Sequence, residues 1–450
     1  MCSRINDSSF LLVSVDIILI VMAALRVSLP IRPLWQPGDE KLQVMIDNRQ
    51  LPQINFRNWP RISLPRLFAI SCIVGSLIAT QAVASEAVAP EPKGVRDFAA
   101  YWASAQLLLA SQNAYSPVAL LALQRKLGWQ DSSPLVMWNP PWTFAVTLPF
   151  GLLDFAVGQF LWLLLHVFVL LIAARLLWNI YGEPADRYRL AWFLTVTFVP
   201  SVFVLVIGQI APLVLAGFAG FLYFERRGKK FTAGALLALT LVKPHFLYLF
   251  WIVFALWLIQ RNKWRIFCGA AVAGLVAAAM PLFFNPSVYS QYVELFRPTD
   301  LQLPLDLPAP TLRNAVKLLL ELDVGAWQTL PSLLGVIWAV YYWWRHRTDW
   351  QWPERLPLVL IVSLTTSAYT WTFDQVIFLP AIIQGAGWLA HQRLPWYKSF
   401  AALLYLAVDL AHGAMRVFVA EELWYFWLAP ALFAAYLVYL WEARRNLRPA

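Results

Sequence analysis

Apolar runs of helical length, separated by short polar segments, follow one another along most of the chain. The uncharged run 190–224 can hold two membrane crossings, which need roughly 20 residues each, and we expect them at 190–207 and 210–224. Further apolar helices are expected at 67–85, 155–179, 231–242, 246–260, 266–284, 327–344, 356–367, 375–390, 398–415 and 422–441. The segments 231–242 and 246–260 could also form one interrupted helix. The pattern predicts an all-α polytopic integral membrane protein with about 10–13 transmembrane helices.

The region after the first expected crossing has a helical periodicity of its own. Apolar and aromatic residues recur at helical spacing over 97–110, and Pro117 can begin a second helix that ends near Leu127. Amphipathic helices of this kind lie in the membrane interface. The apolar segment 142–153 is only about 18 Å long as a helix, whereas the hydrocarbon core is about 30 Å thick. We therefore expect 142–153 to be a re-entrant or partly inserted segment.

The composition supports a membrane protein and excludes several soluble classes. Hydrophobic residues make up 60% of the chain and charged residues 13%, against roughly 45–50% and about 25% in soluble domains. The three cysteines form no disulfide or metal-binding pattern. No Gly-rich phosphate loop is present, which argues against an enzyme that uses cytoplasmic nucleotides.

The net charge of +10 is best explained by membrane orientation. Basic residues collect in cytoplasmic loops, and the expected crossings place every basic cluster on one side of the membrane. No basic, aromatic-rich polar stretch suggests a nucleic-acid partner. The predicted organisation is a cytoplasmic segment 1–66, a transmembrane domain 67–442 with extracytoplasmic loops 86–140 and 285–326, and a basic cytoplasmic tail 443–450.

The N-terminal segment allows two interpretations. Residues 10–25 are apolar, but the run is short and Asp16 interrupts it. A buried aspartate costs about 2.5–3.5 kcal/mol on insertion scales. The stretch could be a weak apolar helix, or the native start could lie downstream near Met45.

Asp97 is the first candidate for chemistry, because it is an acid in a long polar loop at the start of a predicted helix. An acid at this position also stabilises a helix by about 0.3–1 kcal/mol through the helix dipole. Lys243 and His245 interrupt an apolar run, where ionisable groups are costly unless they have a function or reach the interface. These residue types alone do not establish a reaction.

Several short stretches, taken in their order along the chain, form a recognisable set. They are Asp97–Trp102 with Ala114–Pro117, Asn139–Trp142 with Leu148–Phe150, Gly208-Gln209, Arg226–Lys229 with Ala233-Gly234, Lys243-Pro244, and Ser367–Asp374. In this order they resemble glycosyltransferase family 87 of the GT-C class. Known members of this family include polyprenyl-phosphate-mannose-dependent mannosyltransferases.

The resemblance implies a GT-C-type bundle with interfacial helices in the first extracytoplasmic loop, and Asp97 as the general base. The expected reaction moves a hexose, mannose by resemblance, from a polyprenyl-phosphate carrier to a glycolipid or other envelope glycan, with inversion. The protein would work in the bacterial cytoplasmic (inner) membrane, surrounded by membrane lipids, with its active site facing the extracytoplasmic side. Positioned carboxylates commonly take the proton of an attacking hydroxyl.

The leaving phosphate requires positive charge or hydrogen-bond donors where its own charge develops. The candidates for the donor phosphate or the substrate are Arg96, Lys243, His245, Arg297, Arg313, Asn314, Tyr101, Trp102, Gln209, Trp371 and Asp374. No cofactor is expected. Some GT-C enzymes use a divalent cation, but the five histidines are scattered and the first loop has no DxD-like pair, so no metal site is indicated.

A transporter or flippase for a lipid-linked or hydrophobic substrate is the alternative. Broken apolar segments and the charged Lys243 would suit it. Such a protein should gather ionisable residues at mid-membrane depth, whereas here the polar residues gather in two long loops. No inverted repeat relates the halves of the chain.

Overall fold

The computed structural model describes residues 96–182, 187–297, 307–319, 326–391, 395–419 and 421–445. The expected segment 1–66, the first crossing 67–85 and the last residues of the basic tail lie outside these residues. The described residues of the first half of the chain form α3 (Arg96–Leu109), α4 (Pro117–Lys126), η2 (Pro141–Thr143), α5 (Phe144–Gly151), α6 (Phe155–Tyr181), α7 (Tyr188–Thr197), α8 (Val199–Ile207) and α9 (Ala211–Arg226).

The described residues of the second half also form helices joined by turns and loops. Its elements are α10 (Lys230–Leu237), η4 (Ala238–Val242), η5 (His245–Leu247), α11 (Tyr248–Arg261), α12 (Trp264–Ala279), η6 (Met280–Phe283), α13 (Val288–Glu294), α14 (Leu312–Leu319), η8 (Ala326–Thr329), α15 (Leu330–His346), α16 (Trp352–Thr366), η9 (Thr372–Phe378), α17 (Leu379–His391), α18 (Pro395–Phe418), η10 (Glu422–Trp427) and α19 (Leu428–Arg445). The all-α prediction is confirmed.

Four helices of the described chain are long and apolar enough to cross a membrane. They are Phe155–Tyr181, Trp264–Phe283, Thr372–Ala390 and Glu422–Glu442. A fifth span results if α7 and α8, which meet at a bend of 62°, count as one. The large apolar side chains of α6 that remain exposed, such as Phe160 and Phe168, are those expected to face lipid. The chain is an integral membrane protein.

Within the described residues, fewer helices reach spanning length than the 10–13 crossings expected from the whole sequence, because turns interrupt several of the apolar segments. The expected helix 190–207 is broken at Phe198, one residue before the Val199-Pro200 start of α8. The region 231–260 is interrupted at Lys243-Pro244, which leaves the shorter helices Lys230–Val242 and His245–Arg261. Proline cannot donate the hydrogen bond that would continue a helix.

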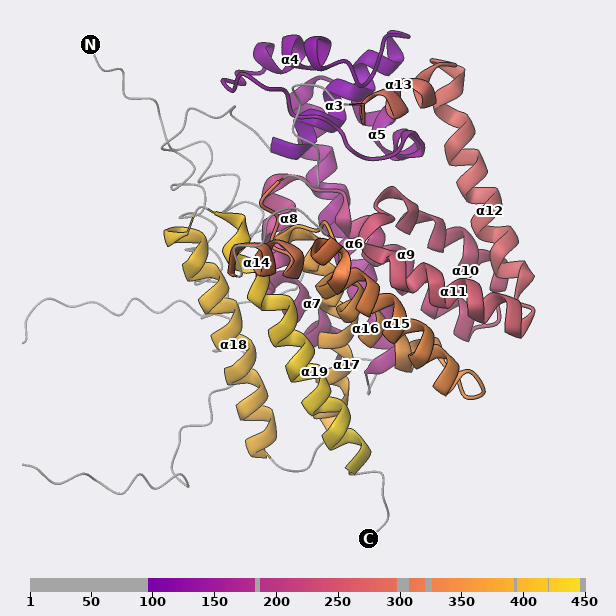
Figure 1. The fold of residues 1–450 in the computed structure, drawn as a ribbon, viewed down its shortest axis with the longest axis vertical. Helices are drawn as coiled ribbons and strands as arrows, with labels where there is room; N and C mark the ends of the chain where they lie inside the picture. Colours follow the sequence, from indigo (N-terminus) through magenta and orange to yellow (C-terminus); the bar gives the residue numbers. More distant parts are fainter. Residues whose placement is uncertain are drawn as a thin grey trace, which may run out of the picture. The chain divides into compact units, whose positions relative to one another are not determined.

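The expected amphipathic helices of the first loop are present as α3 and α4, and they lie together with α5 and α13 (Figure 1). Pro117 is the first residue of α4, and the Ser116 hydroxyl accepts a hydrogen bond from the Ala119 amide at 3.4 Å. α5 has 8 residues, about 12 Å of helix, so it is too short to cross the bilayer.

α3 is fixed by an aromatic cluster. Phe98 is fully buried, and its ring centroid lies 5.6 Å from those of both Phe155 and Trp162 on α6. Gly151 of α5 packs against Ala105 so closely that an added Cβ would lie 2.6 Å from the alanine methyl. These contacts hold the first turn of α3, which carries Asp97, against α6.

The two long polar loops contact each other. Asn285 donates a hydrogen bond to the Gln112 carbonyl at 2.9 Å, and the Tyr292 hydroxyl donates one to the Trp138 carbonyl at 3.1 Å. Both donors lie in the second loop and both acceptors in the first. The loops therefore lie on the same side of the transmembrane helices.

Helices α10 and α12 pack backbone to backbone through two glycines. A Cβ built on Gly234 would lie 1.8 Å from the Ile266 carbonyl oxygen, and one built on Gly269 would lie 2.0 Å from the Phe231 carbonyl oxygen. Such contacts between small residues are a common basis of helix association in membranes.

Gly234→Ala and Gly269→Ala should each destabilise the protein, because the added methyl forces the two helix backbones apart. We expect a cost of about 1–3 kcal/mol for each, seen as a lower midpoint of thermal unfolding in detergent. Gly385→Ala is the matched control, since nothing lies within 4 Å of its built Cβ. Equal midpoints for all three variants would contradict this account of the packing.

Candidate active site

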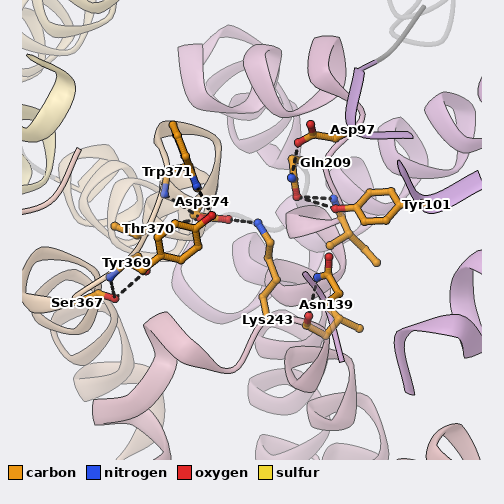
Figure 2. Close-up of polar contacts among 12 residues, drawn as sticks. Asp97, Tyr101, Asn139, Gln209, Lys243, Ser367, Tyr369, Thr370, Trp371 and Asp374 are labelled. Atoms are coloured by element: carbon orange, nitrogen blue, oxygen red, sulfur yellow. Dashed lines mark hydrogen bonds and ion pairs between the residues drawn. The ribbon is translucent and has the colours of Figure 1, made fainter. Parts of the chain in front are cut away.

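Asp97 lies in the first turn of α3, at the end of the helix that faces the turn between α8 and α9. Its side chain is partly buried, and its Oδ2 accepts a hydrogen bond from the Gln209 side-chain amide. Figure 2 shows this contact beside the Tyr101 hydroxyl, which donates to Gln209 Oε1 at 2.9 Å. Asp97 and Gln209 are 112 positions apart in the chain, so this contact depends on the tertiary fold.

The Gly208-Gln209 turn is positioned by the end of α8. Gly208 has φ of +76°, a left-handed conformation that ends the helix and that glycine adopts without strain. Its carbonyl accepts a hydrogen bond from the Trp162 indole at 2.8 Å. The backbone N–H of Gln209 donates to the Val204 carbonyl at 2.9 Å. The turn is thereby fixed to α6, the same helix that holds α3.

A buried ion pair forms the other half of the site. Lys243 Nζ lies 2.6 Å from Asp374 Oδ1, and the two side chains are only 7% and 0% exposed. The ammonium is also 4.6 Å from the centroid of the Phe373 ring. Asp374 Oδ2 accepts from the Trp371 backbone amide at 3.0 Å and lies 3.5 Å from the Thr370 hydroxyl. The carboxylate is thus satisfied on both oxygens.

Lys243 is positioned by an interruption in the helical backbone. Since Pro244 has no N–H, the carbonyls at the end of η4 lack their usual helical partners. Two side chains take this role: Asn139 donates to the Val242 carbonyl at 2.8 Å, and the Trp142 indole donates to the Leu241 carbonyl at 2.7 Å. The segment around η2 therefore fixes the backbone that carries Lys243.

The two halves act on each other electrostatically. Burial is the largest influence on Asp97 and raises the pKa of its carboxyl above the ordinary value of 3.8. The positive charge of Arg96, the bond from Gln209 and the charge of Lys243 oppose this rise in the pKa of Asp97, while the Asp374 charge adds to it. A carboxylate and an ammonium group therefore influence each other within one site, where Figure 2 places Lys243 between Asp374 and Gln209.

Comparison with known proteins identifies the family. The family model described as glycosyltransferase family 87 matches residues 137–364, half of the chain. The chain belongs to glycosyltransferase family 87. It is therefore a membrane glycosyltransferase, with a sugar donor and a glycan or lipid acceptor, which favours an enzyme over the transporter alternative. No curated protein and no solved structure matches it.

The matched region of this family 87 protein contains Asn139, Gln209 and Lys243, while Asp97 and Asp374 lie on either side of it. Asn139 was not predicted as a site residue, although it begins one of the stretches that carry the family resemblance. Its role is visible only in the fold, because its amide supports the backbone next to Lys243.

Tyr369 and Thr370 are the other unpredicted residues that the structure brings to the site of the family 87 transferase. The Tyr369 hydroxyl accepts from the Trp371 indole at 2.6 Å, and its ring lies 5.4 Å from that of the predicted His245. Both residues fall in the stretch 367–374 that carries the family resemblance. The sequence therefore marked this stretch, but it assigned no role to Tyr369 or Thr370.

The remaining predicted residues are placed less directly. Arg96 is exposed, with its guanidinium 5.7 Å from the centroid of the Trp129 ring, although its charge acts on Asp97. The Trp102 indole donates to the Leu153 carbonyl at 2.9 Å and packs on Phe155. Trp102 thus contributes to holding α3.

Three further predicted residues lie after α13 and on α14. Arg297 is exposed after α13. On α14, Arg313 donates to the Gln328 side chain, and Asn314 donates to the carbonyls of Leu307 and Ala309 at 3.1 Å and 2.9 Å. Their role in binding substrate stays a prediction. Within the described residues, no group of three or more His, Cys, Asp or Glu side chains could hold a metal ion.

Loss of one partner of the Lys243–Asp374 pair should be costly. Lys243→Met leaves an unpaired buried carboxylate, and we expect a loss of about 3–5 kcal/mol of stability. Combining Lys243→Met with Asp374→Asn should recover most of this loss, since no charge then remains buried. Thermal unfolding in detergent measures both, with Lys317→Met, at an exposed position, as the control. Additive losses in the double variant would show that the two residues are not coupled.

Proposed function

We propose that this family 87 transferase moves a hexose from a polyprenyl-phosphate carrier to an extracytoplasmic lipid-linked or envelope glycan, with Asp97 as the general base. The observation that supports this most directly is that the Lys243 ammonium acts on the Asp97 carboxyl, where its positive charge lowers the pKa. A base and a cation at one site are the two groups that attack by a hydroxyl and departure of a phosphate require.

The proposed reaction is a single displacement. An acceptor hydroxyl oxygen attacks the anomeric carbon, and its proton passes to Asp97. The bond between the anomeric carbon and the phosphate oxygen breaks, and the electron pair leaves with the lipid phosphate. Attack opposite to the leaving group inverts the anomeric centre. A positioned base contributes typically about 10²–10⁴-fold to such a step.

Lys243 is proposed to stabilise the leaving phosphate. In the structure its charge is neutralised by Asp374, so the donor phosphate has to approach an ion pair. Asp374 keeps two other donors, from Trp371 and Thr370, and these hold its carboxylate in place when the ammonium turns toward phosphate. Arg96, whose charge also reaches the site, is the second candidate for the phosphate.

The identity of the sugar and carrier rests on the family resemblance, which favours mannose on an undecaprenyl or decaprenyl phosphate. The side of the membrane rests on the basic clusters. We assign to the cytoplasm the basic clusters Arg226–Lys230, Arg261–Arg265 and Arg345–Arg347. The two contacting loops, which carry the site, are then assigned to the opposite face of the membrane. The proposed location is the bacterial cytoplasmic membrane.

Asp97→Asn should abolish most transfer, since the amide cannot accept the hydroxyl proton. We expect a fall of about 10²–10⁴-fold in the transfer of label from radiolabelled polyprenyl-phosphate mannose to lipid extract, with purified protein in membranes. Asp131→Asn, an exposed acid of the same loop, is the matched control and should retain full transfer.

Full transfer by Asp97→Asn would show that Asp97 is not the general base. Transfer from a glucose or arabinose carrier in place of mannose would correct the sugar and leave the mechanism unchanged.

A further inference from the structure

The orientation of the Gln209 side chain is fixed by its surroundings. Gln209 Oε1 lies 3.2 Å from the Ile210 backbone nitrogen and 2.9 Å from the Tyr101 hydroxyl. A backbone N–H can only donate, so the amide atom that faces Ile210 is the oxygen. The side-chain nitrogen is therefore turned toward Asp97 Oδ2, as Figure 2 shows.

This arrangement leaves Gln209 poorly suited to bind a sugar, which is the role its sequence position suggested. The residue is only 9% exposed. Both lone pairs of its carbonyl are used, by Tyr101 and by Ile210, and one of its two N–H donors is directed at Asp97. Its polar atoms bond to the protein in this structure.

The same arrangement has a consequence for Asp97. The Gln209 nitrogen donates and cannot accept, so its bond favours the charged carboxylate over the protonated acid. Burial acts in the opposite direction and raises the pKa of Asp97. A base that is protonated cannot take a proton, so the donor from Gln209 offsets the effect of burial.

We propose that Gln209 is a positioning residue that holds the Asp97 carboxylate deprotonated and directed at the acceptor hydroxyl, with Tyr101 fixing the Gln209 amide from behind. The proton of the acceptor then goes to Asp97 Oδ1, the oxygen opposite to the Gln209 contact. The part that concerns the acceptor rests on the proposed function, whereas the effect on the protonation of Asp97 does not.

Other charged and titratable groups also act on Asp97, and the substitution of Gln209 leaves all of them in place. They are Arg96 and Tyr101 on α3, Lys243 between η4 and η5, Asp374 on η9 and Tyr369 before η9. Burial raises the pKa of Tyr101 well above its ordinary value, so its hydroxyl stays protonated and remains a donor. Substitution at Gln209 removes none of these groups.

The first experiment titrates Asp97 directly in the purified protein, without any substrate. The carboxyl C=O infrared band that is lost in Asp97→Asn identifies the residue. Gln209→Met is of similar size but lacks the donor. As the pH is lowered, the midpoint at which this band appears should lie about one pH unit higher in Gln209→Met than in wild type, as expected for the loss of a hydrogen bond to a carboxylate. Gln106→Met is the matched control, because Gln106 lies on α3 with Asp97 but donates its hydrogen bond to the Gly151 carbonyl.

A milder variant keeps the test valid if Gln209→Met does not fold. Tyr101→Phe removes one hydroxyl and loosens the Gln209 amide, so the Asp97 band should shift in the same direction by a smaller amount. Tyr115→Phe, which removes a buried hydroxyl bonded to the Asn139 carbonyl, should leave the band unchanged.

The transfer assay provides the second readout. Because a higher pKa of Asp97 leaves more of it protonated at a given acidic pH, transfer by Gln209→Met should decline at a higher pH than transfer by wild type, with the KM for the donor unchanged. A raised KM with an unshifted pH profile would mean that Gln209 binds substrate and would overturn the proposal.

The two proposals fail in different ways. An unshifted infrared titration in both Gln209→Met and Tyr101→Phe would overturn the role of Gln209, whatever the activity. A shifted titration in a protein whose wild type transfers no sugar would overturn the proposed function and support the role of Gln209 in controlling Asp97.

Discussion

The burial of charge in an apolar helical bundle is the constraint on which this structure depends. The Lys243 ammonium and the Asp374 carboxylate are withdrawn from water, and neither could remain charged there alone. Their contact joins residues 131 positions apart. It ties η9, at the start of α17, to the break between η4 and η5. The position of the site follows from the need to satisfy these charges together.

The polar residues of the site occur where the helical backbone is interrupted. The α8–α9 turn, the Lys243-Pro244 break and the stretch 367–374 each leave backbone groups without helical partners. Side chains of other elements supply them: Trp162 bonds to the Gly208 carbonyl, and Asn139 and Trp142 bond to the end of η4. Irregular backbone is tolerated in a membrane protein where it is buried against protein. The interruptions therefore place polar side chains inside the bundle and also fix their positions.

Periodicity alone predicted much of the secondary structure. The helix expected over 97–110 is α3, and the helix expected to begin at Pro117 is α4, with its predicted end near Leu127. The long helix expected at 155–179 is α6. The bend at Phe198 was missed, because 190–207 is apolar without interruption, although Pro200 near the start of α8 marks a place where a helix can begin anew.

The sequence by itself determined the membrane class, the helical architecture and the resemblance to family 87, because these depend on composition, on spacing within one helix and on short motifs in order. It also selected Asp97, Gln209, Lys243 and Asp374 as candidates. Only the tertiary structure decided that Lys243 pairs with Asp374 and that Gln209 bonds to Asp97. These contacts join residues that packing brings together, and no local pattern encodes which side chain of one helix meets which side chain of another.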